Sequence, residues 1–282
     1  MTPEGKFPAS RLGRPALDEP AVYPGPRAGY SYLLLGEHIL PLQASDTRLG
    51  QWKVPSEPGL SLQDVLSRAH ATPTDDRAAV LAFGSNASPP QLARKFAGVP
   101  GSAIPVVRGW VYGLRLAFSA HLNRLGYIPA AVRSAASTAD KLPVWVTFLD
   151  DEQLKVLDAT EPAYNRVVLS YGQGRPVVEL ESGEWLAAAA LYRTRWGVLD
   201  LEACDELGLI TQLALKQLLE ARCSEMVSLF ASPQVAGSAR TLLAEVPGFA
   251  ELGLVVEDGL QDWVVGESAV YSRIGSFSPV KD

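Results

Sequence analysis

A wholly apolar strand that runs straight into a glycine turn and a helix is the feature that most constrains this chain. Residues 78–83 are all apolar, which is typical of a strand buried on both faces. Residues 84–86, Gly-Ser-Asn, follow at once, and a helix then begins with Ser88 as N-cap and Pro89 in its first position. Gly98 suits the end of that helix. A turn of this kind collects backbone N–H groups and therefore favours the binding of an anion.

The prolines at the start of the helix decide which donors the turn offers. Pro89 and Pro90 have no N–H. The remaining donors are the N–H groups of residues 84–87, the Ser85 hydroxyl and the Asn86 amide. That set suffices for one carboxylate, and the turn lacks the glycines and the lysine of a phosphate-binding loop. A plain strand-to-helix turn without a ligand is the alternative interpretation.

A glutamate falls where a later helix should place a core residue. Leu154, Leu157 and Asp158 follow the i, i+3, i+4 spacing of one helix face, and Glu161 continues it at i+7. Burial on such a face disfavours the ionised form of a carboxyl group. A glutamate placed there can both take and give a proton near neutral pH. Pro162 supports a second interpretation, in which the helix ends before Glu161 and its side chain turns to water.

The overall charge and apolar content exclude several classes of function. The chain has 282 residues, 47% of them hydrophobic, which is enough for one or two domains with a substantial core. Its formal charge is −6 and it has no basic run, so it lacks a broad attraction for nucleic acid or anionic membranes. The longest apolar stretch, residues 186–192, is too short to span a bilayer.

The cysteines and histidines indicate neither disulfides nor metal. Cys204 and Cys223 form no CxxC pair, and the N-terminus has no apolar signal-peptide core, so we expect a reduced, cytoplasmic setting. The histidines, His38, His70 and His121, are not spaced for a metal site. The sequence therefore predicts no metal and no cofactor, and it leaves a homodimer open.

Composition divides the chain into four segments. Residues 1–29 are rich in proline and glycine and read as a disordered or extended tail. Residues 30–77 form an N-terminal extension that packs on the core, residues 78–195 form the core, and residues 196–282 form a helical C-terminal extension.

Strands are predicted at residues 30–36, 37–42, 78–83, 110–118, 127–133, 143–149, 166–171, 177–180 and 186–192, and helices at 62–69, 209–230 and 239–246. This pattern favours an α+β fold with a largely antiparallel, strongly curved or closed sheet.

The glycine turn and the glutamate together resemble the gamma-glutamylcyclotransferase-like superfamily. The resemblance covers roughly residues 78–195 and leaves both extensions unexplained. It implies a small mixed closed or strongly curved β-barrel with surrounding helices, in which the glutamate stands inside a cavity rimmed by the glycine turn. The residues that carry it are Phe83, Gly84, Ser85, Asn86, Gly126, Tyr127, Leu157, Asp158, Ala159, Thr160, Glu161, Tyr164 and Arg166.

The resemblance implies a reaction and roles for its residues. The family releases 5-oxoproline from a gamma-glutamyl amine or peptide by an intramolecular acyl transfer, so a small-molecule gamma-glutamyl substrate is expected. Glu161 would be the general acid/base. The chain departs from the family in Phe83, where tyrosine is common, and in Pro162, where glycine is frequent. The residues expected to bind substrate are Phe83, Gly84, Ser85, Asn86, Tyr127, Tyr164 and Arg166.

Three other interpretations stay open. A relative without catalysis would bind a small acid or serve as a scaffold, and an enzyme of the same fold would trim a gamma-glutamyl cap from a larger molecule. A serine hydrolase would need Ser85 beside a histidine base, for which His121 is the candidate in the core. Asp158 is a second carboxylate in the cavity, or it orders the end of the helix or pairs with a base such as Arg166.

Overall fold

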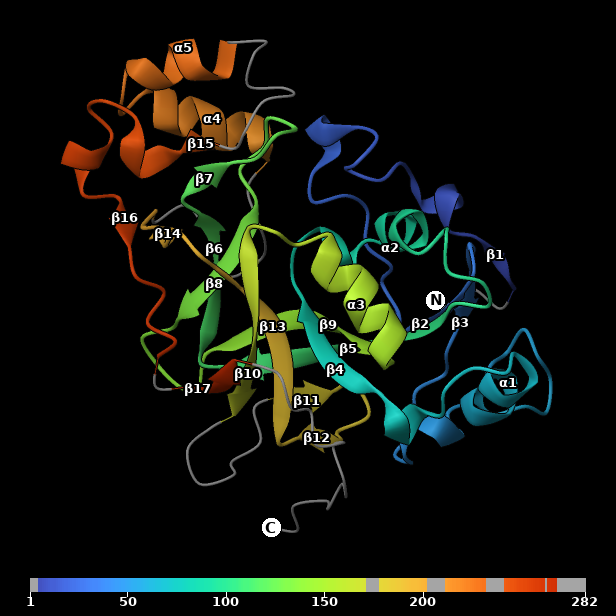
Figure 1. Ribbon diagram of the computed structural model, residues 1–282. Coiled ribbons are helices and arrows are strands. Elements are labelled where there is room, and N and C mark those ends of the chain that lie inside the picture. The colour runs from blue at the N-terminus through green and yellow to red at the C-terminus, as the bar shows by residue number, and fades with distance from the viewer. Residues whose placement is uncertain (1–4, 171–177, 202–210, 232–240, 262, 268–282) are drawn as a thin grey trace.

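The main sheet forms the centre of the molecule (Figure 1). The computed structural model describes residues 5–170, 178–201, 211–231, 241–261 and 263–267. Within them the main sheet has eleven strands, and β4 and β13 pair parallel while its other pairs are antiparallel. The order is β1 (Phe7–Pro8), β3 (His38–Pro41), β2 (Tyr32–Leu35), β5 (Ala103–Tyr112), β9 (Lys141–Leu149), β4 (Ala78–Ala82), β13 (Ala188–Thr194), β10 (Tyr164–Ser170) and β17 (Val264–Glu267), with β11 (Val178–Leu180) and β12 (Trp185–Leu186) joined through β5.

Smaller sheets and short helices surround this sheet. The helices are α1 (Leu62–Arg68), α2 (Pro89–Lys95), α3 (Asp151–Ala159), α4 (Gln212–Glu220) and α5 (Glu225–Ala231). The second sheet contains β16 (Val255–Val256), β14 (Val198–Leu199), β6 (Leu114–Ser119) and β8 (Ala130–Ser134), and the third pairs β15 (Thr241–Leu242) with β7 (His121–Leu122). Short 3-10 helices cover Ala9–Leu12, Pro20–Val22, Leu49–Gln51, Thr74–Asp76, Ser85–Ala87, Leu243–Glu245 and Ala250–Leu252. In Figure 1, α4 and α5 lie beside β7 and β15 at the end of the molecule opposite α1.

The fold is α+β with mixed sheets, but the expected β-barrel is wrong. No sheet closes on itself among the described residues, because the main sheet ends at β1 on one side and at β17 on the other. The strand predicted over residues 110–118 is also interrupted. Gly113 has a φ of 69°, a conformation that glycine adopts readily, and it turns β5 into β6. The two strands belong to different sheets, so the chain distributes its strands instead of closing them into one barrel.

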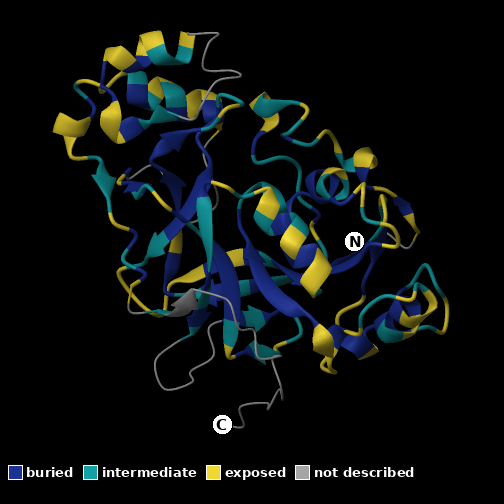
Figure 2. Ribbon diagram, viewed as in Figure 1, coloured by how far each residue is buried: buried dark blue, intermediate teal, exposed yellow. Residues whose placement is uncertain are grey.

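The apolar strand predicted at residues 78–83 is confirmed as β4, which is buried on both faces. Leu81 belongs to a core cluster on one face of the sheet. Val80 belongs to the cluster on the other face, together with Leu154 and Leu157 from α3. Figure 2 shows the central strands as buried, with α3 exposing its outer side. This double burial explains the unbroken apolar sequence and fixes the point where the glycine turn emerges.

The N-terminal extension completes the main sheet. The hairpin predicted at residues 30–42 is confirmed as β2 and β3, and β2 pairs with β5 through Leu34 and Ile104. The helix predicted at residues 62–69 is confirmed as α1. At its N-terminus, Ser61 and Asp64 form a reciprocal capping box. Residues 5–29 also pack on the core, where Tyr23 is 6% exposed. The four-segment division of the chain stays a prediction.

The C-terminal extension differs from the predicted helices. The described part of the helix predicted at residues 209–230 is split: α4 ends at Glu220 with Ala221 as C-cap, and α5 begins at Glu225. Residues 209 and 210 lie outside the described residues, as do Cys204, Tyr171, Val177 and residues 239–240. The described part of the helix predicted at residues 239–246 is instead β15 and a 3-10 turn.

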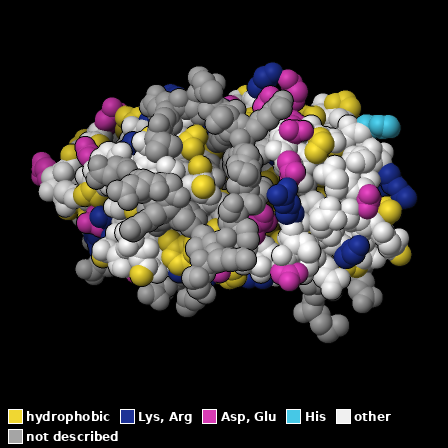
Figure 3. Space-filling model, turned by 90° about the horizontal axis from the view of Figure 1, so that it is seen from below, with side chains coloured by type: hydrophobic (Ala, Val, Ile, Leu, Met, Phe, Trp, Pro, Cys, Tyr) yellow, Lys and Arg dark blue, Asp and Glu magenta, His cyan; other side chains and the backbone are white. Residues whose placement is uncertain are grey.

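The surface carries charges of both signs. On the face seen in Figure 3, acidic and basic side chains are interspersed over the part that the structure describes. No helix in the described ranges combines the length and the apolar character needed for a membrane span.

Candidate functional site

A cavity of about 750 Å³ lies where β4 ends. Its volume falls within the range of roughly 300–1,000 Å³ that is usual for small-molecule sites. Five stretches of chain and a residue of β13 form its wall: the N-terminal segment, the end of β4 with its glycine turn, α2, the stretch from β7 to β8, and the turn after α3. The wall includes Tyr23, Phe83, Gly84, Ser85, Asn86, Lys95, His121, Arg124, Tyr127, Glu161, Tyr164 and Tyr192.

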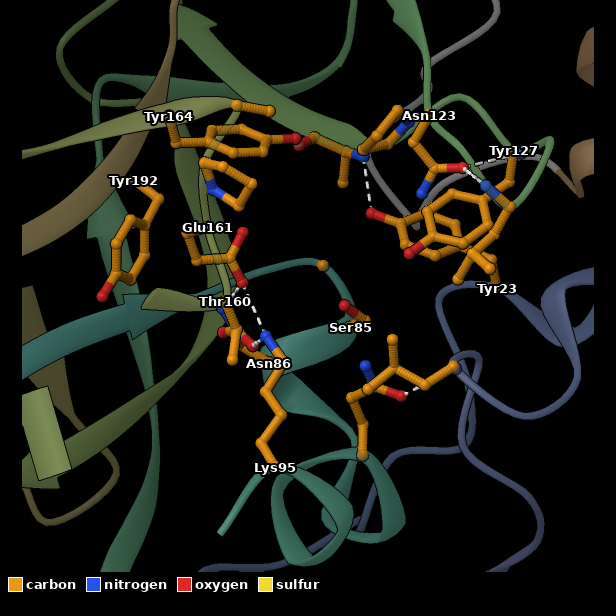
Figure 4. Close-up of a pocket in the computed structure, with 18 of the residues that line it drawn as sticks. Tyr23, Ser85, Asn86, Lys95, Asn123, Tyr127, Thr160, Glu161, Tyr164 and Tyr192 are labelled. Atoms are coloured by element: carbon orange, nitrogen blue, oxygen red, sulfur yellow. Dashed lines mark hydrogen bonds and ion pairs between the residues drawn. The ribbon is translucent and has the colours of Figure 1, made fainter. Parts of the chain in front are cut away.

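Glu161 lies on this wall although its helix ends before it. Helix α3 ends at Ala159 with Thr160 as C-cap, and the Glu161 N–H closes a turn onto the carbonyl of Asp158. The interpretation based on Pro162 was therefore right about the helix end. It was wrong about the side chain, which is only 14% exposed and faces the cavity (Figure 4).

A lysine joins the glycine turn to the glutamate. The Nζ atom of Lys95 lies 2.6 Å from Oε1 of Glu161 and 2.7 Å from Oδ1 of Asn86. The Asn86 amide Nδ2 donates to the same Glu161 oxygen at 3.0 Å. These contacts form a closed triangle at the base of the cavity, which Figure 4 shows between α2 and the turn after α3. The two sequence features that were predicted to form one site are therefore in direct contact.

The glycine turn keeps three backbone donors for a ligand. The N–H groups of Ala87 and Ser88 donate to carbonyls within the turn. Those of Gly84, Ser85 and Asn86 have no hydrogen-bond partner among the described residues. Ser88 occupies the predicted N-cap position of α2 without a side-chain capping bond, and α2 ends at Lys95, earlier than Gly98 predicts. The cavity thus has an available set of N–H donors next to Glu161.

Tyr23, Tyr127 and Tyr164 are three of the four tyrosines on the wall. Tyr23 stacks on Tyr127 with 4.2 Å between ring centroids, and its hydroxyl accepts a hydrogen bond from the Ala130 N–H at 2.6 Å. The Tyr164 hydroxyl donates to the Ala130 carbonyl at 3.0 Å. Burial raises the pKa of Tyr127 to about 12 and raises the pKa values of Tyr23 and Tyr164 further. All three rings are therefore neutral at physiological pH.

Arg166 does not lie on the cavity wall, unlike the other predicted site residues. Its Nε and Nη2 atoms donate to the two carboxylate oxygens of Asp158 at 2.8 and 3.0 Å. The Tyr192 hydroxyl donates to the same carboxylate at 2.8 Å. The predicted pairing of Asp158 with Arg166 is confirmed, and it holds the end of α3 to the strand that carries Tyr192. The substrate-binding roles assigned to the wall residues stay predictions.

Sequence reasoning missed Lys95 and Tyr23. Lys95 had a signal, since Leu92, Lys95 and Phe96 follow the i, i+3, i+4 spacing that drew attention to Glu161. Leu92 and Phe96 are buried, and the Lys95 side chain is 4% exposed. Tyr23 had no such signal, because it stands alone in a segment rich in proline and glycine.

The arrangement does not fit a serine hydrolase. His121 lies on the cavity wall, but its Nδ1 atom bonds to the Ser119 hydroxyl at 2.7 Å. Within the described ranges no hydrogen bond joins Ser85 to His121. A serine nucleophile needs such a bond to its base.

The charges on the wall favour an anionic ligand. The wall carries the cations Lys95 and Arg124 and the anion Glu161, so its formal balance is positive in an acidic chain. Arg124 is exposed and forms no ion pair among the described residues. Because Lys95 and Glu161 pair with each other, a ligand with a carboxylate would meet the charge of Arg124 and the N–H groups of the turn.

Comparisons with known proteins find distant structural neighbours. No family model and no curated protein matches the chain. The neighbours include a gamma-glutamyl cyclotransferase (12% identity, TM-score 0.32, 70% of this chain and 95% of that chain). A protein of Arabidopsis thaliana solved in solution is 17% identical with a TM-score of 0.32, and the match covers 55% of this chain and 89% of that chain. An uncharacterized protein of Homo sapiens is 13% identical with a TM-score of 0.31, and the match covers 71% of this chain and 96% of that chain. With TM-scores and identities this low, the function is inferred from the cavity itself.

Proposed function

We propose that the protein is a gamma-glutamylcyclotransferase that releases 5-oxoproline from a gamma-glutamyl amine or peptide. The observation that carries the proposal is the contact between Asn86 of the glycine turn and Glu161, at 3.0 Å on the wall of a ligand-sized cavity. This contact brings the largely buried carboxylate of Glu161 and a set of N–H donors to one place. Intramolecular acyl transfer needs these two components, because a proton must move and a negative oxygen must be stabilised.

The reaction begins with the substrate's α-ammonium group, which must lose a proton before its nitrogen can attack. Glu161 accepts that proton as a carboxylate. Its Oε1 atom already accepts hydrogen bonds from Lys95 and Asn86, so Oε2 is the oxygen available to the substrate. The neutral amine then attacks the γ-carbonyl carbon, a C–N bond forms, and the carbonyl electron pair moves to the oxygen.

The second half of the reaction expels the leaving amine. The N–H groups of Gly84, Ser85 and Asn86 stabilise the negative oxygen or bind the substrate's α-carboxylate. As the carbonyl re-forms, the original C–N bond breaks and Glu161 returns its proton to the departing nitrogen. The ring nitrogen still carries a second proton, which it gives to the regenerated Glu161 carboxylate, and Glu161 passes that proton to the released amine. The five-membered lactam of 5-oxoproline and a free amine result. Because nucleophile and carbonyl belong to one molecule, the protein mainly has to fold the substrate into a reactive shape.

The experiment that tests this proposal is direct product analysis. The purified protein is incubated with a gamma-glutamyl dipeptide, a gamma-glutamyl alkylamide and a larger molecule that carries a gamma-glutamyl cap. Chromatography then measures 5-oxoproline, and Glu161→Gln is the control. Product from the wild type alone supports the proposal. A preference for the capped molecule assigns the protein to a trimming reaction, and absence of 5-oxoproline from all three overturns the proposal.

Binding of a small acid without catalysis is the second candidate. It is favoured by the engagement of Glu161, whose Oε1 atom is held by two donors. A cavity wall with positive charge also suits a carboxylate that is bound and kept. Calorimetry with 5-oxoproline separates the two functions, since a pure binding protein takes up the acid while releasing none from gamma-glutamyl compounds.

A further inference from the structure

Lys95 is a buried cation in direct contact with the proposed general acid/base. Its side chain is 4% exposed, and a lysine is rarely buried this far unless it is paired. The Nζ atom lies 2.6 Å from Glu161 Oε1, within the range of a charge-assisted hydrogen bond. The pair lies on the wall of the cavity rather than deep in a core cluster. Its location therefore points to a role in the site.

The contacts of Lys95 determine how two other side chains are oriented. Its bond to Asn86 Oδ1 fixes the orientation of that amide, so that Nδ2 points to Glu161. Both donors then converge on Glu161 Oε1. The other carboxylate oxygen, Oε2, has no hydrogen-bond partner among the described residues. Lys95 thus fixes both the orientation of the Asn86 amide and the orientation of the Glu161 carboxylate.

We propose that Lys95 is a positioning residue that holds Glu161 as a carboxylate with Oε2 presented to the substrate. This inference rests on the proposed function and adds to it a residue that acts through Glu161. Lys95 stabilises the negative charge before the substrate binds, and Asn86 transmits the same constraint to the glycine turn.

The other titratable groups around Glu161 do not replace this charge. Tyr164 from β10, Tyr192 from β13, Tyr23 from the N-terminal segment and Tyr127 from the stretch before β8 all surround the carboxylate. Burial raises the pKa of each of these hydroxyls, so they stay neutral through the range in which enzymes are assayed. In direct contact with Glu161, the described residues provide one ion pair, that with Lys95.

A double-mutant cycle on stability tests the pair without reference to any reaction. Lys95→Met leaves a carboxylate buried without its cation, and we expect Tm to fall by roughly 5 °C or more. Glu161→Gln with Lys95→Met removes both charges, so Tm should recover most of that loss. Lys155→Met is the matched control, because Lys155 pairs with Glu152 on the surface and is 70% exposed. Its Tm should match the wild type.

The same variants test the positioning role in the reaction. In the wild-type background, Lys95→Met should lower kcat by roughly 10- to 100-fold, the loss measured when a side chain that orients a metal ligand is removed. In the Glu161→Gln background, Lys95→Met should change kcat less than about 2-fold, since Lys95 acts through Glu161.

Each outcome has a separate meaning. Equal rate losses from Lys95→Met in both backgrounds would overturn the positioning role and leave a structural lysine. Additive Tm losses would overturn the pair itself. If the Tm cycle shows coupling but the wild type forms no 5-oxoproline, the reaction is wrong while the Lys95–Glu161 pair stands.

Discussion

Tyr23 lies flat against Tyr127, with ring centroids 4.2 Å apart and an interplanar angle of 20°, although one residue belongs to the N-terminal segment and the other to the core. The segment is therefore part of the cavity. Tyr23→Ala should lower the free energy of unfolding by about 3–5 kcal/mol, because it removes a buried ring. Tyr23→Phe should cost about 1–2 kcal/mol, because the buried Ala130 N–H loses its acceptor. Denaturant unfolding measures both.

Val22 provides the control for Tyr23, since it is adjacent and 37% exposed. Val22→Ala should change stability by less than about 0.5 kcal/mol. If Tyr23→Ala is as mild as Val22→Ala, the N-terminal segment does not hold the cavity wall in solution.

Gly84 is required because Tyr23 approaches it closely. A Cβ atom on residue 84 would lie 3.0 Å from the Tyr23 hydroxyl and 3.2 Å from Ala130 Cβ. Gly84→Ala should therefore cost about 1–3 kcal/mol through overpacking. In a Tyr23→Phe background the cost should shrink, because the nearest atom is gone. Urea unfolding of the four proteins measures this coupling.

Gly98 gives the comparison for Gly84, because nothing lies within 4 Å of a Cβ built there. Gly98→Ala should be within about 0.5 kcal/mol of the wild type. An equally small effect of Gly84→Ala would mean that Tyr23 does not sit against the glycine turn.

Alkaline pH should destabilise the protein through its buried tyrosines. Burial raises the pKa values of Tyr23, Tyr32, Tyr127, Tyr164 and Tyr192, while a tyrosine in the unfolded chain ionises near pH 10. Above about pH 10 the folded state therefore holds more protons than the unfolded state, and stability falls as pH rises. The slope is about 1.4 kcal/mol per pH unit for each such tyrosine.

Urea unfolding between pH 8 and pH 11, followed beside the ultraviolet absorbance of tyrosinate, measures this effect. These five hydroxyls should ionise only as the protein unfolds. Full ionisation of the folded protein near pH 10 would contradict the burial of the aromatic wall.

Local sequence signals predicted the parts of the site that depend on neighbouring residues. The apolar run at residues 78–83 and the turn after it depend on local preferences, and the structure has both. Of the roles left open for Asp158, the structure has the pairing with Arg166, which lies shortly after it in sequence. Pro162 correctly indicated where the helix ends.

Long-range packing decided the features that the sequence did not reveal. Residues 1–29 have no apolar periodicity, so the sequence does not reveal that Tyr23 packs against Tyr127 of the core. The barrel was predicted from an antiparallel strand pattern, yet whether a sheet closes depends on the pairing of its edges. Gly113 redirected the chain after β5, and a glycine inside a strand pattern does not reveal which sheet the next strand joins.

The central claim is that Glu161 moves the proton in a gamma-glutamyl cyclisation, and Glu161→Gln tests it most directly. The measurement is kcat for 5-oxoproline release by the wild type and the variant, with the Kd of 5-oxoproline determined by calorimetry for both. A fall in kcat of roughly 10²- to 10⁴-fold with Kd changed only a few-fold is the predicted result. A variant that keeps the full rate of the wild type would contradict it.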